Sequence, residues 1–111
     1  MSSLEDAVTR HVELFNAAVA QSDFGALVDT FAPTAVMRFL GVPAGPFVGR
    51  DAIARAYEQT PPDDTMSIVD IAEAGPHTAQ VRFAWTRGGT GSMTMSWNDG
   101  QLIDLTVAFD G

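Results

Sequence analysis

The stretch of sequence that says most about the architecture is TAQVRFAWTRGGTGSMTMSWNDGQLIDLTVAF, residues 78–109. Two glycine-containing dipeptides, Gly88-Gly89 and Asp99-Gly100, divide this stretch into three segments. Glycine tolerates the positive φ that tight turns require, so both dipeptides predict turns between strands. Connections this short join neighbouring strands in antiparallel order. We therefore predict an antiparallel meander with strands at residues 78–87, 92–98 and 102–109.

Large apolar and small polar side chains alternate along each of these runs. A period of two places each set on one face of the sheet. The set predicted to face inward is Val81, Phe83, Trp85, Met93, Met95, Trp97, Ile103, Leu105, Val107 and Phe109. The set predicted to face outward is Gln80, Arg82, Ala84, Thr86, Thr94, Ser96, Asn98, Leu102, Asp104, Thr106 and Ala108. Within this outer set, we expect Arg82 and Asp104 to pair.

The residues before the meander predict mainly helices. Apolar residues recur at three- and four-residue steps through residues 4–21, the pattern of a helix with one buried stripe. The other expected helices are Phe24–Phe31, ended by Pro33, and Asp51–Gln59. The other expected extended segments are Ala35–Leu40, Phe47-Val48 and Thr65–Glu73. Helices followed by a meander of strands are typical of the α+β class.

Composition and charge narrow the class of protein. A length of 111 residues, of which 46% are hydrophobic, predicts one globular domain over residues 1–111. The net charge of −8 argues against nucleic acid or an anionic membrane as the partner. Cysteine is absent, and His11 and His77 have no acidic residues at ligand spacing, so we expect no metal and no cofactor. The sequence shows no membrane-spanning apolar run and no signal-peptide pattern, so we expect a cytoplasmic location.

Each face of the predicted sheet leaves two interpretations open. If the helices cover the inner face completely, the result is an ordinary core; if they do not, an apolar cavity remains. The outer face, rich in Thr and Ser, suits contact between the sheets of two copies, or it faces solvent. We favour a homodimer whose contacts are Arg82, Thr94, Ser96, Asp104 and Thr106.

Four segments, taken in order, resemble one known superfamily. They are FNAAVAQSD (15–23), LVDTFAPTAV (27–36), FVGRDAI (47–53) and WNDGQLI (97–103). Together they span nearly the whole chain and are similar to the nuclear transport factor 2-like superfamily, which includes ketosteroid isomerases and SnoaL-type polyketide cyclases. The resemblance implies the cone-shaped, cystatin-like fold, in which a curved sheet wraps around a helix-capped pocket, usually in a dimer. It does not specify the chemistry, because one fold carries many activities.

The catalytic apparatus of the ketosteroid isomerases does not carry over onto this sequence. Where the resemblance would place the oxyanion-donating Tyr, the general-base Asp and the second acid, this chain has Phe15, Phe39 and Met93. Phe and Met can neither remove a proton nor hold an oxyanion. A supporting Tyr on the third helix does match, at Tyr57. The SnoaL-type cyclases use an Asp on a late strand, for which Asp104 is the nearest candidate, although its parity points outward.

Three functional hypotheses follow. The first is a SnoaL-like pocket protein that binds an apolar small molecule, with Tyr57 and His11 as polar contacts. Its expected walls are Phe15, Val19, Phe39, Tyr57, Phe83, Met93, Trp97, Leu105 and Phe109. The second is a cofactor-free isomerase or cyclase in which Tyr57 polarises a carbonyl and His11 moves a proton. The third is a dimeric interaction scaffold. The plainer alternatives are a packed His11 at the edge of the core and a Tyr57 bonded to backbone.

Overall fold

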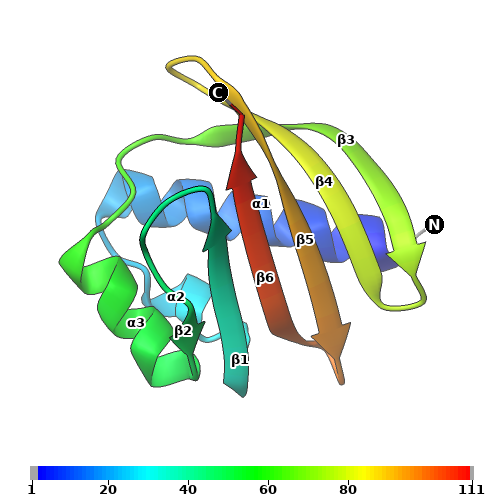
Figure 1. Ribbon diagram of the computed structural model, residues 1–111, viewed down its shortest axis with the longest axis horizontal. Coiled ribbons are helices and arrows are strands. Elements are labelled where there is room, and N and C mark those ends of the chain that lie inside the picture. The colour runs from blue at the N-terminus through cyan, green and yellow to red at the C-terminus, as the bar shows by residue number, and fades with distance from the viewer. Residues whose placement is uncertain (1–2, 111) are drawn as a thin grey trace.

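The computed structural model describes residues 3–110, which form three helices and one six-stranded sheet (Figure 1). The elements are α1 (Ser3–Gln21), α2 (Gly25–Val28), β1 (Phe31–Leu40), β2 (Phe47–Val48), α3 (Arg50–Gln59), β3 (Met66–Gly75), β4 (Thr78–Trp85), β5 (Thr90–Asn98) and β6 (Gln101–Phe109). The strand order is β2-β1-β6-β5-β4-β3, and only the β1–β6 pair is parallel. The predicted α+β class and the mostly antiparallel meander are confirmed.

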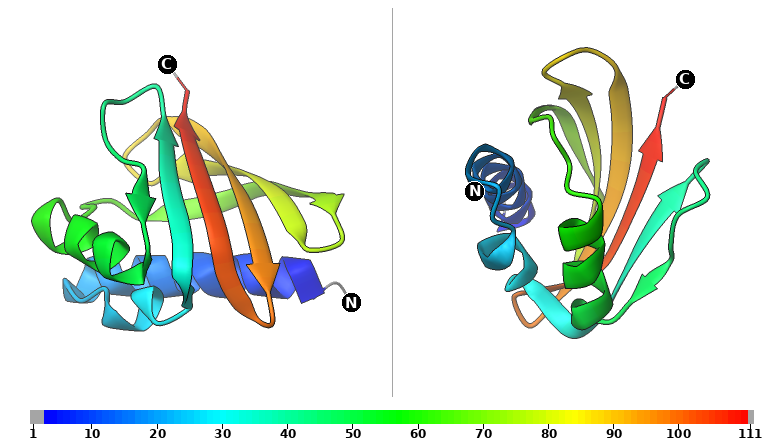
Figure 2. Two further views of the ribbon diagram at one scale, coloured as in Figure 1. Left: turned by 60° about the horizontal axis from the view of Figure 1, so that its bottom comes forward. Right: turned by 90° about the vertical axis from the view of Figure 1, so that its left-hand side faces the viewer.

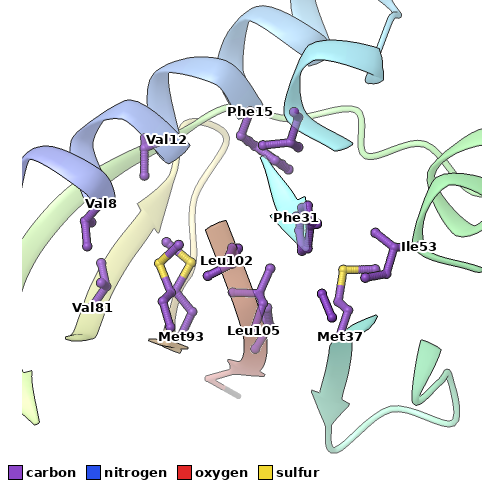
Figure 3. Close-up of a cluster of buried hydrophobic side chains, with 14 of the residues drawn as sticks. Val8, Val12, Phe15, Phe31, Met37, Ile53, Val81, Met93, Leu102 and Leu105 are labelled. Carbon is purple, nitrogen blue, oxygen red and sulfur yellow. The ribbon is translucent and has the colours of Figure 1, made fainter. Parts of the chain in front are cut away.

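The sheet is strongly curved, and α1 crosses its concave side while α3 lies beside β1 and β2 (Figure 2). The apolar stripe of α1 faces the sheet, so that Val8, Val12 and Phe15 point toward residues of β4, β5 and β6 (Figure 3). All three of these side chains are buried. The bulky set predicted from strand parity therefore converges beneath the helices, which is where the core forms.

One side chain of α1 fixes the helix to the start of β3. The Asn16 amide nitrogen donates to the Met66 carbonyl at 2.9 Å, and its amide oxygen accepts from the Met66 backbone N–H, also at 2.9 Å. Met66 begins an edge strand, so these two bonds satisfy backbone groups that have no second strand beside them. Asn16 thus fixes the position of α1 relative to the β3 edge of the sheet.

The second helix is shorter than predicted. We expected it over Phe24–Phe31, whereas α2 covers only Gly25–Val28, and Phe31 already belongs to β1. The backbone N–H of Leu102 donates to the Thr30 carbonyl at 2.9 Å, and Phe31 is in register with Leu102. Pairing with β6 therefore ends the helix before Pro33 does, because the tertiary pairing outweighs local helix propensity. Pro33 lies inside β1, within an irregular stretch of the pairing with β6.

The predicted parity fails at the beginning of β6. Leu102 was expected to face outward and Ile103 inward, but Leu102 is 1% exposed and Ile103 is 37% exposed. The register explains the exchange: Ser96 pairs with Asp104, while the next residue, Trp97, pairs with Leu102. Ile103 is the extra residue of a β-bulge, and a bulge reverses parity for the residues beyond it. From Asp104 onward the predicted faces are confirmed.

The outer face also differs from its predicted ion pairing. Arg82 does not pair with Asp104; it lies 3.5 Å from Asp110, and Asp104 forms its ion pair with Arg38. Register accounts for this, because Arg82 is opposite Ser92 on β5, four residues before Ser96, the partner of Asp104. Neither ion pair is buried.

No helix within residues 3–110 is long and apolar enough to cross a membrane.

Candidate functional site

A cavity of about 730 Å³ lies on the inner face of the sheet and opens to solvent. Its volume is in the range of pockets that bind small molecules. The lining is His11, Phe15, Met37, Phe39, Val42, Ala44, Phe47, Ala56, Tyr57, Gln59, Thr60, Pro62, Asp63, Asp64, Met66, Phe83, Trp85, Arg87, Gly88, Met93, Leu105, Val107 and Phe109. Most of these side chains are apolar, and they come from α1, α3, all six strands and the connections between them.

Most residues predicted as walls border this cavity, and two do not. The predicted residues that line it are His11, Phe15, Phe39, Tyr57, Phe83, Met93, Leu105 and Phe109. Val19 instead borders a second hollow beside α2 and α3. Trp97 packs partly buried against the core at the far end of β5, outside the cavity lining. Strand parity identified the correct face for Trp97, but it carries no information about position along the strand.

An aromatic wall forms one side of the cavity; it consists of Phe39, Phe47, Phe83, Trp85 and Phe109. Phe109 stacks on Phe39 with ring centroids 6.2 Å apart, and on Trp85 at 6.4 Å. Trp85 in turn forms a T-shaped pair with Phe83, with the ring centroids 5.1 Å apart. Strands β1, β6 and β4 therefore present a continuous surface of rings to the cavity, a surface suited to a flat apolar ligand.

Gly91 makes this wall possible. In the register of the sheet it lies between Phe83 on β4 and Phe109 on β6. A Cβ atom at Gly91 would come within 2.6 Å of the Phe83 ring and 2.7 Å of the Ala108 carbonyl oxygen. Only glycine leaves room for the Phe83 ring over β5, which lets side chains from the two flanking strands approach each other.

His11 lies on α1, one turn before Phe15, and its side chain is only 6% exposed. The ring forms a T-shaped pair with that of Phe31, with the ring centroids 6.2 Å apart. Burial lowers the pKa of His11 to about 4, so the imidazole is neutral at neutral pH. No hydrogen bond to its ring nitrogens is found within residues 3–110, yet no side-chain nitrogen or oxygen there is sealed away without a partner. The ring nitrogens therefore reach open space, and His11 borders the cavity.

Tyr57 reaches the cavity from α3. Its ring stacks on Phe24 at 4.9 Å with the planes 7° apart, and the side chain is 7% exposed. Burial raises the pKa of Tyr57, so the hydroxyl stays protonated and can donate a hydrogen bond. In the described part of the chain this hydroxyl, like the His11 ring, has no protein partner and is not sealed off. Tyr57 also borders the second hollow, so it lies on the partition between the two.

The charged side chains of the lining are confined to a rim formed by Asp63, Asp64 and Arg87. The Arg87 guanidinium lies 3.1 Å from the Asp63 carboxylate and 3.6 Å from that of Asp64, and it also donates to the Asp63 carbonyl. Asp64 accepts from the backbone N–H groups of Thr65 at 2.9 Å and Arg87 at 3.1 Å. The rim thereby ties the α3–β3 linker to the β4–β5 hairpin. Sequence reasoning missed these residues, because they meet only through the tertiary structure.

The positions that separate this chain from the ketosteroid isomerases lie in this cavity. Phe15, Phe39 and Met93 all line it, and the carboxylates of the lining are those of the rim. The Asp63 side chain is 89% exposed, which is unlike a buried catalytic acid. Asp104 points to the outer face, as predicted, where it pairs with Arg38. Across residues 3–110, no three His, Cys, Asp or Glu side chains are grouped to hold a metal ion.

The sequence matches the profile of the SnoaL-like domain over residues 11–107, and the chain belongs to that family. A comparison with curated proteins finds no match. The fold is that of the NTF2-like and cystatin-like proteins, as the resemblance implied.

Three solved structures illustrate the similarity. An NTF2-like protein of unknown function from Cytophaga hutchinsonii superposes with a TM-score of 0.76 at 14% identity, covering 99% of this chain and 92% of its own. A provisionally named isomerase from Bacillus subtilis has a TM-score of 0.78 at 13% identity, covering 98% and 90%. A provisionally named polyketide cyclase from Sinorhizobium meliloti has a TM-score of 0.67 at 22% identity, covering 88% and 93%. At these identities the likeness is one of fold.

Proposed function

We propose that this protein binds an apolar, ring-containing small molecule in the cavity on the inner face of the sheet. The observation that carries the proposal is the aromatic wall, which lines a hollow of about 730 Å³ rather than packing into a filled core. Burying apolar ligand surface against such a wall contributes roughly 25 cal/mol per Å². Met37, Met66 and Met93 complete the lining with flexible side chains that adapt to irregular ligand shapes.

The two tryptophans provide an internal test. Trp85 lines the cavity, and Trp97 does not. We expect a panel of uncharged polycyclic compounds to quench the fluorescence of Trp97→Phe, in which Trp85 is the remaining indole. The matched variant Trp85→Phe keeps an aromatic ring in the wall and should show little quenching. If no compound quenches either variant or the wild type at millimolar concentration, the pocket-protein proposal is wrong.

A second candidate is a cofactor-free isomerase or cyclase, and one observation favours it: His11 and Tyr57 border the same cavity. Tyr57 would donate to a substrate carbonyl, and neutral His11 would accept the proton from the neighbouring carbon. Two of the similar structures carry isomerase and polyketide cyclase names. Against it, a pKa of about 4 makes His11 a weak base, and the two carboxylates of the lining, Asp63 and Asp64, are paired with Arg87 at the rim.

Proton exchange distinguishes an enzyme from a binder. We expect an enzyme to speed deuterium uptake at the carbon next to the carbonyl of a bound cyclic ketone, measured by NMR. The variant Tyr57→Phe should slow that uptake, while His77→Gln, changed on the exposed β3–β4 turn, should not. Uptake at the uncatalysed rate with the ketone bound would reject the enzymatic reading and leave the binding proposal standing.

A further inference from the structure

We infer that the ligand of this cavity is an uncharged ring compound carrying a hydroxyl group that bonds to His11, and that the cavity rejects carboxylates. The inference rests on the proposed binding function and specifies the chemistry of the ligand. It is carried by the arrangement of polar groups around the cavity: within residues 3–110 the buried His11 and Tyr57 side chains have no protein partner, and every charge lies at the rim.

Of these two side chains, His11 is the one that does not also border the second hollow. Its ring is enclosed by the core on α1, and no side chain or backbone group within residues 3–110 bonds to it. It borders the cavity on the inner face of the sheet. A neutral imidazole has one N–H donor and one bare nitrogen acceptor, and a hydroxyl group can pair with either.

A ligand without a polar group would leave this imidazole without a hydrogen-bond partner. In the empty cavity, water can reach the ring nitrogens. A pure hydrocarbon that fills the cavity displaces that water and has no hydrogen-bond donor or acceptor to replace it. Leaving a buried donor or acceptor unpaired is costly, and sites with such groups discriminate strongly against analogues that lack the partner. The cavity therefore favours a hydroxylated ring over the same ring without its oxygen.

An anionic ligand finds no compensating charge. Within residues 3–110, the one cation of the lining is Arg87, which lies at the rim and is already engaged by Asp63 and Asp64. A carboxylate in the interior would lose its hydration without gaining a countercharge. At the rim it would meet two carboxylates against one guanidinium, on a chain whose net charge is −8.

Three naphthalene probes test the inference, because they share one ring system. Naphthalene has no polar group, 2-naphthol adds an uncharged hydroxyl, and 2-naphthoate adds a negative charge at neutral pH. Displacement of the uncharged dye Nile red measures all three affinities. For the wild type we expect 2-naphthol to bind at least about fivefold more tightly than naphthalene, and at least about tenfold more tightly than 2-naphthoate, as one hydrogen bond and one unpaired charge require.

Variants of His11 assign the preference. His11→Leu should bind naphthalene at least as well as the wild type and should lose the preference for 2-naphthol. His11→Gln, which retains a donor and an acceptor, should restore part of it. His77→Leu, which removes the exposed histidine, should behave as the wild type.

The possible outcomes test the inference separately from the binding function on which it rests. If naphthalene binds but 2-naphthol is no tighter, or if the preference survives in His11→Leu, then the role of His11 is wrong and the binding function stands. If 2-naphthoate binds as tightly as 2-naphthol, then the exclusion of anions is wrong. If Nile red binds but none of the three displaces it, the inference is wrong and the binding function stands; if neither the dye nor any of the three binds, the binding function fails and the inference fails with it.

Discussion

His11 is a buried titratable side chain that borders the cavity. His11 was chosen from the sequence as a candidate proton carrier, and the plainer alternative was a packed histidine at the edge of the core. The structure combines parts of both descriptions: the ring is buried and packs on Phe31, yet no group within residues 3–110 bonds to its nitrogens, and it borders the cavity. Its burial, rather than any charged neighbour, shifts its protonation.

The pH dependence of stability follows from this burial. The pKa of His11 falls from 6.5 to about 4 on folding, so between these values the unfolded chain binds a proton that the folded chain does not. Stability attributed to His11 is therefore present above pH 6.5 and is lost as the pH falls toward 4. The loss is on the order of 3 kcal/mol for a shift of this size. We expect urea unfolding between these pH values to show it.

The comparison that checks this prediction is a difference between variants, because carboxylates also titrate at the acidic end of the range. His11→Leu should have a flatter stability profile than the wild type, while His77→Leu should keep the wild-type slope. Equal slopes for the wild type and His11→Leu would contradict the prediction.

At the scale of elements, the cavity depends on how strands β4, β5 and β6 are matched. Phe83, Gly91 and Phe109 stand in one row across these strands, with the glycine in the middle. The missing side chain at the centre of the row is what brings the rings of the flanking strands into one wall. The α3–β3 linker and the β4–β5 hairpin then border the same cavity and are held together by Arg87.

Gly91→Ala tests this arrangement. The added Cβ meets the Phe83 ring and the Ala108 carbonyl oxygen, so either the ring or the backbone of β6 must move. Overpacking of this kind destabilises by about 1–3 kcal/mol. We expect a lower urea midpoint and weaker quenching of Trp85 by ring ligands. Ser92→Ala, the next residue on the outer face, is the control; a Gly91→Ala variant with unchanged stability and binding would contradict the role of Gly91.

At the scale of the whole molecule, the outer face of the sheet bears on self-association. Its centre is uncharged, with Thr94 opposite Thr106, while the ion pairs Arg38–Asp104 and Arg82–Asp110 stand beside it. A face with an uncharged centre and a charged rim resembles an interface between two copies. We propose that two copies associate through this face about a twofold axis, so that Arg82, Thr94, Ser96, Asp104 and Thr106 of each copy take part.

Sedimentation checks the proposed dimer. At micromolar concentration we expect the mass of two chains. Thr94→Arg places like charges opposite each other across the twofold axis, so this variant should sediment as one chain. Ala20→Arg makes the same change in charge on an exposed position of α1 and should leave the dimer intact. A wild type that sediments as one chain rules out this association, and with it the reading of the protein as a dimeric scaffold.

Local pattern was enough to predict the α+β class, the meander and the inner face. Each depends on neighbours within a few residues: the period of apolar side chains, and glycine at the turns. The absence of acids at Phe15, Phe39 and Met93 was likewise readable from the resemblance, since it concerns residue identity alone. Most of the cavity lining on the strands followed from the same parity.

Long-range pairing decided the rest. The β-bulge at Ile103 exchanged the faces of two residues, and pairing of Phe31 with β6 shortened α2. The helical cover left the inner face partly open, and the rim brought Asp63 to Arg87, two residues that lie on different connections. Such features depend on contacts between distant segments. The spacing of apolar residues along the chain carries no information about the free energies of those contacts.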